Sequence, residues 1–221
     1  MDETIARMQA IAAALPPNDG LACFNRMSLQ ITQTVASDVG QNFFADPVYL
    51  TKLDVIFANI YFDAVNALTT SPENLPAAWA PLLQARASTD VEPIQFALAG
   101  MNAHINHDLP VAVVSTCTAL GTAPDSGRHH DDYQKVDQLL DAAEQAVRQS
   151  FESGMARAAD KHLTAVANLV ANWSIRSARD VAWDTSLALW ELRHAGFARD
   201  LLMGSLGRTV GMASRILLAA V

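Results

Sequence analysis

The stretch GMNAHINHDLPVA, residues 100 to 112, carries two histidines, two asparagines and an aspartate inside one of the most apolar runs of the chain. Imidazole and carboxylate groups can exchange protons with a substrate or ligate a metal ion. In a helix His104 and Asp108 are one turn apart and His107 lies about 60° from His104, so all three project toward one side. We therefore predict His104, His107 and Asp108 as catalytic residues, flanked by Asn102 and Asn106 as substrate-binding residues.

The same cluster also has a structural interpretation. Buried histidine and asparagine side chains often fix the register of packed helices, and Asp108 can simply hold His104 in one tautomer. Each unsatisfied buried polar group costs about 1 to 3 kcal/mol, so this many polar residues in one apolar helix require compensation. The sequence leaves a catalytic and a structural role open.

A second polar group lies in WSIRSARDVAWDTSLALWELRH, residues 173–194. Asp180 and Asp184 are one helical turn apart, and two carboxylates at that spacing repel each other unless a cation lies between them. The arginines that could supply the positive charge are Arg176 and Arg179. The alternative is a divalent metal (Zn, Fe or Mn) held by His104, Asp108, Asp180 and Asp184, a mixed nitrogen and oxygen shell that suits these ions.

Other polar and aromatic residues are weaker candidates for a functional site. Tyr61 and Trp183 are predicted to contribute to the wall of a substrate cavity. ELRH, residues 191–194, matches the Glu-x-x-His element of di-iron bundles, but the sequence holds no second copy. In HHDD, residues 129–132, an aspartate is expected to cap a helix and the histidines to be solvated loop residues.

These side chains must be positioned by helices, because helical periodicity runs through the whole chain. In DDYQKVDQLLDAAEQAVRQSF, residues 131–151, apolar side chains recur every three or four positions. Similar patterns predict helices over about residues 2–15, 21–39, 47–69, 76–87, 93–120, 156–173, 176–195 and 198–219. We predict one all-α domain, residues 1–221, with about eight or nine helices. Pro110 cannot donate to the carbonyl of Asn106 and disfavours helical geometry at Leu109, so the central helix should kink or break there.

Composition narrows the classes of partner. The net charge is −8 and no Lys/Arg cluster occurs, which disfavours nucleic acid and anionic membranes and favours a small-molecule ligand or substrate. Cys23 and Cys117 form no CxxC pair and are expected to be buried thiols. The start of the sequence lacks a basic region typical of a secretory signal, and no apolar run is long enough to span a membrane, so we expect a cytoplasmic protein. The apolar final helix suggests core packing or a homodimer interface.

Four blocks of the sequence carry a resemblance. LPPNDGLACFNRM, LDVIFANIYFDAV, IQFALAGMNAHINHDLPVAVV and ARDVAWDTSLALW together resemble an uncharacterised family of helical bacterial proteins, a domain of unknown function. The resemblance implies one recurring helical scaffold and supplies no activity. The His-x-x-x-Asp pair near Pro110 also faintly resembles helical zinc phospholipases and nucleases, which use several further histidines and an N-terminal Trp that this chain does not offer.

Two classes of function follow. The first is an enzyme acting on a small, largely apolar molecule, by metal-assisted hydrolysis or oxidation or as a cofactor-free cyclase or isomerase with His/Asp acid–base chemistry. The second is a non-catalytic protein that binds a small molecule in the same cavity or has only a structural role.

Overall fold

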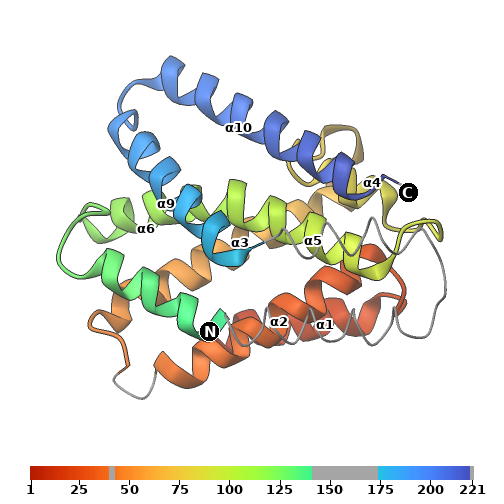
Figure 1. Ribbon diagram of the computed structural model, residues 1–221, viewed down its shortest axis with the longest axis horizontal. Coiled ribbons are helices and arrows are strands. Elements are labelled where there is room, and N and C mark those ends of the chain that lie inside the picture. The colour runs from red at the N-terminus through yellow and green to blue at the C-terminus, as the bar shows by residue number, and fades with distance from the viewer. Residues whose placement is uncertain (40–42, 141–173, 220–221) are drawn as a thin grey trace.

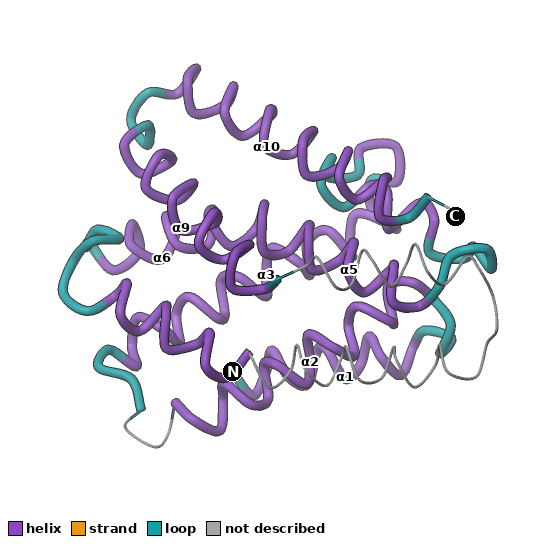
Figure 2. Tube along the Cα trace, in the orientation of Figure 1, coloured by secondary structure: helices purple, strands orange, loops and turns teal. Residues whose placement is uncertain are grey.

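Helices form nearly all of the chain that the computed structural model describes, residues 1–39, 43–140 and 174–219 (Figure 1). The α-helices that lie wholly within these ranges are α1 (Asp2–Ala14), α2 (Gly20–Val39), α3 (Pro47–Thr70), α4 (Ala80–Ala85), α5 (Pro93–Ala103), α6 (Leu109–Leu120), α9 (Ile175–Glu191) and α10 (Gly196–Leu217). A 3-10 turn covers Pro72–Asn74, a π-helical turn covers His104–Asp108, and residues 129–140 are also helical. No strand occurs in these described ranges (Figure 2), so the all-α prediction is confirmed. The helix predicted over 156–173 lies outside them, as does the second half of the one predicted over 131–151.

Local sequence signals explain where the helices begin and end. Asp46 caps α3 by accepting a hydrogen bond from the backbone N–H of Tyr49 at 2.9 Å, and Pro47 occupies the first turn. Glu92 and Gln95 form a reciprocal capping box at the start of α5. Gly121 ends α6 with a φ of 67°, a left-handed conformation that glycine adopts without steric cost.

The predicted central helix is formed by α5, the π-helical turn and α6, which follow one another through the middle of the molecule (Figure 1). Every residue from Gln95 to Ala103 is buried, as its apolar composition predicts. Of the kink or break predicted near Pro110, the break does not occur, because Leu109 keeps helical angles (φ −63°, ψ −44°). Instead its N–H bonds the carbonyl of His104, five residues back. The chain thus accommodates Pro110 by widening one turn.

The π-helical turn is contacted from several directions. α5 and α6 flank it in the sequence, and α3, α9 and α10, which are distant in the sequence, also pack against it. Figure 1 shows α1 and α2 on one side of the central helix and α10 on the other. The polar segment His104–Asp108 is therefore at the centre of the packing rather than on a surface.

The last helix is held very close to the loop before α4. A Cβ atom added at Gly211 would lie 2.2 Å from the backbone oxygen of Ala77, so only glycine permits this approach. The outer face of α10 is different, because it exposes large apolar side chains: Phe197, Leu201, Met212 and Ile216. A homodimer through this helix stays a prediction. Within the described residues, no helix has the length and apolar character needed to cross a membrane.

Candidate functional site

The carboxylate of Asp108 is the centre of the polar cluster. The side chain is fully buried, with an exposed fraction of 0%. Its Oδ2 atom lies 2.9 Å from Nε1 of Trp79 and 3.1 Å from Nδ1 of His104, and its Oδ1 atom lies 2.8 Å from Nδ1 of His107. Three nitrogen donors thus surround one buried carboxylate, which satisfies it without an arginine or lysine.

These contacts determine the protonation state of the cluster. Burial alone would raise the pKa of Asp108, but the hydrogen bonds from His104 and His107 outweigh it and hold the pKa below its ordinary value. An ionised carboxylate can only accept hydrogen bonds, so Nδ1 of each histidine carries the hydrogen. Whenever the imidazole of His104 is neutral, its lone pair is then on Nε2, which has no hydrogen-bond partner among the described residues.

The π-helical turn explains why both histidines reach the same carboxylate. His104 and Asp108 are separated by four residues, the spacing at which side chains of a helix meet. His107 is adjacent to Asp108 in sequence, a spacing that does not bring side chains together in a regular α-helix. In this structure both meet Asp108 within the widened turn, and π-helical turns are frequent at functional sites.

Aromatic rings fix the orientation of His104. Its imidazole is stacked on the ring of Phe57, with centroids 3.6 Å apart and planes 5° from parallel. Phe24 and Tyr61 approach it edge-on, at 5.6 and 5.9 Å. His104 is 5% exposed and is therefore held by both its hydrogen bond and its packing, which is the preorganisation that a catalytic group requires.

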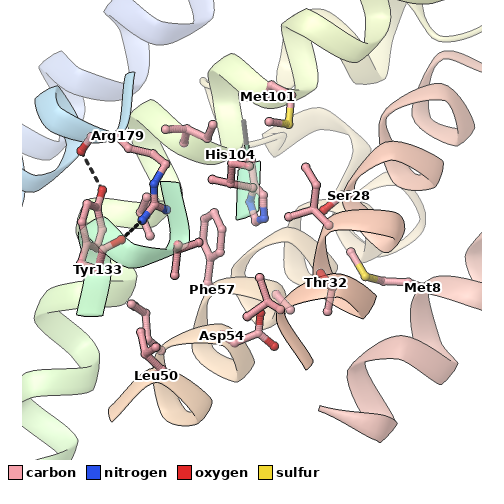
Figure 3. Close-up of a pocket in the computed structure, with 18 residues that line it drawn as sticks. Met8, Ser28, Thr32, Leu50, Asp54, Phe57, Met101, His104, Tyr133 and Arg179 are labelled. Carbon is pink, nitrogen blue, oxygen red and sulfur yellow. Dashed lines mark hydrogen bonds between the residues drawn. The ribbon is translucent and has the colours of Figure 1, made fainter. Parts of the chain in front are cut away.

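His104 lines an apolar cavity of about 90 Å³ (Figure 3). The cavity is bounded by side chains of α1, α2, α3, the central helix, the helical residues 129–140 and α9. Its apolar wall includes Met8, Ile31, Val35, Leu50, Leu53, Phe57, Met101, Ile105, Leu109, Val136 and Leu140. A single water needs about 10 to 15 Å³ by the same measure, so the space is large enough for several waters or a small organic molecule.

Few polar side chains face this cavity besides His104. Ser28 and Thr32 line it from α2, and Asp54 lines it from α3 (Figure 3). Oδ2 of Asp54 is buried and has no hydrogen-bond partner in the part of the chain that the structure describes. Burial raises the pKa of Asp54 to about 6, because the charged form is poorly solvated there. The cavity wall, which also includes Tyr133 and Arg179, therefore contains a carboxylate whose Oδ2 lacks the hydrogen bonds that hold Asp108.

Of the predicted catalytic residues, only His104 reaches the cavity. Asp108 lies behind it, and His107 faces α10, where its Nε2 atom would be 3.6 Å from a Cβ atom added at Gly207. The structure thus brings the three residues together, as the spacing predicted, but gives them different positions. Asp108 and His107 are placed to orient His104, not to touch a molecule in the cavity.

The predicted substrate-binding residues do not line the cavity. Asn102 donates to the carbonyl of Val210 and to the hydroxyl of Ser214, both at 2.9 Å, and Asn106 donates to Asn102. These asparagines therefore join α5 to α10. The hydroxyl of Tyr61 donates to Asn25 within the core. Trp183 stacks against the ring of His130. The structural interpretation fits these four residues better, because their polar atoms or rings are engaged elsewhere.

The predicted four-residue metal shell is not assembled. Asp180 and Asp184 are exposed on α9, whereas His104 and Asp108 are buried in the centre. Arg179 does not lie between the two aspartates, because its Nε atom pairs with Asp137 at 2.5 Å. Within the described ranges, no group of three or more His, Cys, Asp or Glu side chains is arranged to hold a metal ion.

The expectations for the HHDD stretch were partly wrong. The helix begins at His129, which is buried and stacked on Tyr49 with centroids 3.9 Å apart. Asp132 does not cap its own helix but accepts hydrogen bonds from the backbone of Ala45 and Asp46, before α3. His130 is exposed, as predicted, and so are Glu191 and His194. Both cysteines are free and buried, which confirms that expectation.

Sequence reasoning missed Trp79 and Asp54. Asp54 has a detectable signal: it lies four residues after Leu50 and three before Phe57, so an acidic residue shares the apolar face of a helix. Trp79 has no such signal, because nothing in a short, proline-flanked loop indicates that its ring nitrogen reaches Asp108, 29 positions away.

Comparisons with known proteins give a family and no activity. No curated protein and no solved structure matches the chain. The model of one family, described as a family of unknown function, matches residues 1–220. This range includes the whole candidate site, from Met8 on α1 to Arg179 on α9. The chain therefore belongs to the family of unknown function DUF5995.

Proposed function

We propose that the protein is an enzyme that removes a proton from a small, largely apolar molecule bound in the cavity, with His104 as the general base. One observation carries this proposal: Nδ1 of His104 lies 3.1 Å from the buried, ionised Asp108, while its ring lines the apolar cavity. This arrangement leaves Nε2 as the nitrogen that can accept a proton. Asp108 is a positioning residue that stabilises the imidazolium formed.

The surroundings suit a cofactor-free isomerase or cyclase. The substrate's C–H bond transfers its proton to Nε2, and the imidazolium can return the proton to another atom of the same molecule. Apolar side chains line the cavity beside His104, and an apolar setting strengthens the electrostatic interaction between the imidazolium and Asp108. We place this chemistry ahead of metal-assisted hydrolysis or oxidation, because the described side chains around His104 offer no further set of metal ligands.

The second candidate function is binding without catalysis. It is supported by the predominance of apolar side chains in the cavity and by the tight stacking of His104 on Phe57. In this case the imidazole would be part of the wall and would exchange no proton. The two candidate functions differ in one measurable property, which is whether the protein accelerates the removal of a proton from a molecule bound in the cavity.

A model reaction separates them. The compound 5-nitrobenzisoxazole opens to a coloured nitrophenolate when a base removes its ring C–H proton and its N–O bond breaks, without any cofactor. We expect the wild-type protein to accelerate this reaction and His104→Ala to lose most of the acceleration, because a positioned base contributes about 10²- to 10⁴-fold. His194→Ala is the matched control, since His194 is exposed in the turn that follows α9 and does not line the cavity. Equal rates for wild type and His104→Ala, with both folded by circular dichroism, would refute catalysis by His104.

We also infer a small-molecule partner and a cytoplasmic location. The net charge of −8 opposes binding to nucleic acid or anionic membranes. The two free, buried cysteines suit a reducing compartment. Cell fractionation with an antibody against the chain tests the location, and recovery in a membrane or extracellular fraction would contradict it.

A further inference from the structure

The carboxylate of Asp54 is the polar feature of the cavity that the proposed base chemistry does not use. Its Oδ2 atom is buried without a hydrogen-bond partner among the described residues, and the side chain lines the same cavity as His104 (Figure 3). A carboxylate in an apolar setting is unfavourable unless a donor or a positive charge compensates it. The positive charge of the N-terminal amino group of Met1 lowers the pKa of Asp54, but by less than burial raises it, and no described side chain donates a hydrogen bond to Oδ2.

The other titratable groups that face the cavity are already engaged. Arg179 pairs with Asp137 at 2.5 Å and donates to the backbone oxygen of Tyr133 at 2.6 Å. The hydroxyl of Tyr133 in turn donates to the backbone oxygen of Arg179 at 2.7 Å. His104 is bonded to Asp108. The cavity is thus lined by one unpaired anion and by no cation that is free to pair with it among these groups.

The remaining lining of the cavity suits the apolar part of a ligand and the N–H groups of an amine. Ser28 and Thr32 line it from α2 and carry hydroxyl oxygens that can accept hydrogen bonds. Phe57, on the same helix as Asp54, offers an aromatic ring next to which a cation is favourable. A neutral alcohol brings only one donor hydrogen and no charge, so it compensates Asp54 less well than an ammonium group.

We propose that the cavity binds a small primary amine with an apolar body, whose ammonium group pairs with the carboxylate of Asp54. This proposal names the substrate class of the proposed function. It rests on that function because it requires that a small molecule enter the cavity. The ammonium group is held at Asp54 on α3, and the apolar body extends along the wall that includes His104. The ion pair orients the molecule relative to the base.

Titration calorimetry with benzylamine and benzyl alcohol tests the amine preference. The two compounds have the same ring and nearly the same size, and only benzylamine is charged. At pH 7.5 we expect wild type to bind benzylamine at least ten-fold tighter than benzyl alcohol. Asp54→Asn should remove this preference, whereas Asp63→Asn should keep it, because Asp63 is an exposed aspartate on the same helix. Equal affinity of wild type for both compounds, or an unchanged preference in Asp54→Asn, contradicts the proposal.

The pH dependence gives a second readout. Because burial raises the pKa of Asp54 to about 6, the carboxylate is protonated at pH 5 and must lose its proton to pair with the amine. Benzylamine stays charged over this range. Its affinity should therefore fall about ten-fold from pH 7.5 to pH 5, because the ionised fraction of Asp54 falls by the same factor. The affinity of benzyl alcohol should change little. A benzylamine affinity that is independent of pH in this range opposes the proposal.

The failures of the two proposals can be distinguished. If benzyl alcohol binds and 5-nitrobenzisoxazole is opened by His104, but benzylamine has no advantage, the amine proposal alone is wrong. If benzylamine binds through Asp54 but no proton abstraction occurs, the cavity binds amines without catalysis and the enzyme proposal is wrong. If neither compound binds and no acceleration is seen, both are wrong.

Discussion

Trp79 donates the hydrogen of its indole nitrogen to Oδ2 of Asp108, with 2.9 Å between the two heavy atoms. Trp79 precedes α4 and is 1% exposed, so the short α4 region supplies one of the three donors that hold the central carboxylate. The same oxygen also accepts from His104. Packing of Trp79 and orientation of His104 are therefore connected through one atom of Asp108.

Replacing Trp79 by Phe tests this connection. The variant keeps an aromatic ring but leaves Asp108 with one fewer donor, so we expect the free energy of unfolding to fall by about 1 to 3 kcal/mol. Urea unfolding followed by circular dichroism measures it. Trp190→Phe is the control, because Trp190 is only partly buried and Arg193 covers its ring. A loss in Trp79→Phe no larger than in the control would show that the hydrogen bond contributes little.

Asp54→Asn is predicted to stabilise the protein at neutral pH. Burial raises the pKa of Asp54 to about 6 in the folded state, above the unfolded value near 4. The protein therefore has its full stability below about pH 4, where Asp54 is protonated in both states. It loses stability as the pH rises through 6, because the buried side chain must then ionise. At pH 7.5 the variant should be more stable on the order of 1 to 2 kcal/mol, a figure discounted for partial solvent screening. At pH 4 the two proteins should melt alike. Thermal melts at both pH values decide this, and a destabilised variant at pH 7.5 contradicts the burial of an unpaired carboxylate.

Gly211→Ala should displace α10 from the loop before α4. The added Cβ would lie 2.2 Å from the backbone oxygen of Ala77, which cannot rotate away, so we expect a loss of about 1 to 3 kcal/mol. In Gly204→Ala the nearest atom is the end of the flexible Arg208 side chain, at 3.3 Å. That control should be unchanged or gain up to about 1 kcal/mol from helix propensity. Similar melting temperatures for the two variants would disprove the close contact.

The double change of Asp180 and Asp184 to Asn should be nearly neutral. Both side chains are exposed on α9, and exposed carboxylates usually alter stability by no more than about 0.5 kcal/mol. Metal analysis of wild type and variant should also agree. A strong loss of stability, or loss of a bound metal in the variant, would restore the predicted metal shell.

The helices and the polar centre could be predicted from the sequence, because periodicity and spacing are local. The four-residue separation of His104 and Asp108 predicts their contact, which the structure gives as 3.1 Å. The structure corrects the effect of Pro110, since a helix can absorb a proline by widening one turn as well as by breaking.

The residues that define the cavity could not be predicted in the same way. Asp54 lies on α3, His104 on the π-helical turn and Trp79 in the loop before α4, and which of their polar atoms meet depends on how these segments pack. Asn102 illustrates the opposite error. Its position beside the histidines suggested a substrate contact, but its amide joins α5 to α10 through Val210 and Ser214. Spacing within one helix predicts neighbours on that helix, not the partners across it.

The protonation of His104 tests the central claim most directly. Nitrogen-15 NMR distinguishes a protonated ring nitrogen from one with a free lone pair, and His104→Gln identifies the signals. At pH 7.5 we predict hydrogen on Nδ1 and a lone pair on Nε2 in wild type, and loss of this single tautomer in Asp108→Asn, whose amide can both donate and accept. Hydrogen on Nε2 of wild-type His104 would contradict the account, because the nitrogen left to accept a proton would then face Asp108.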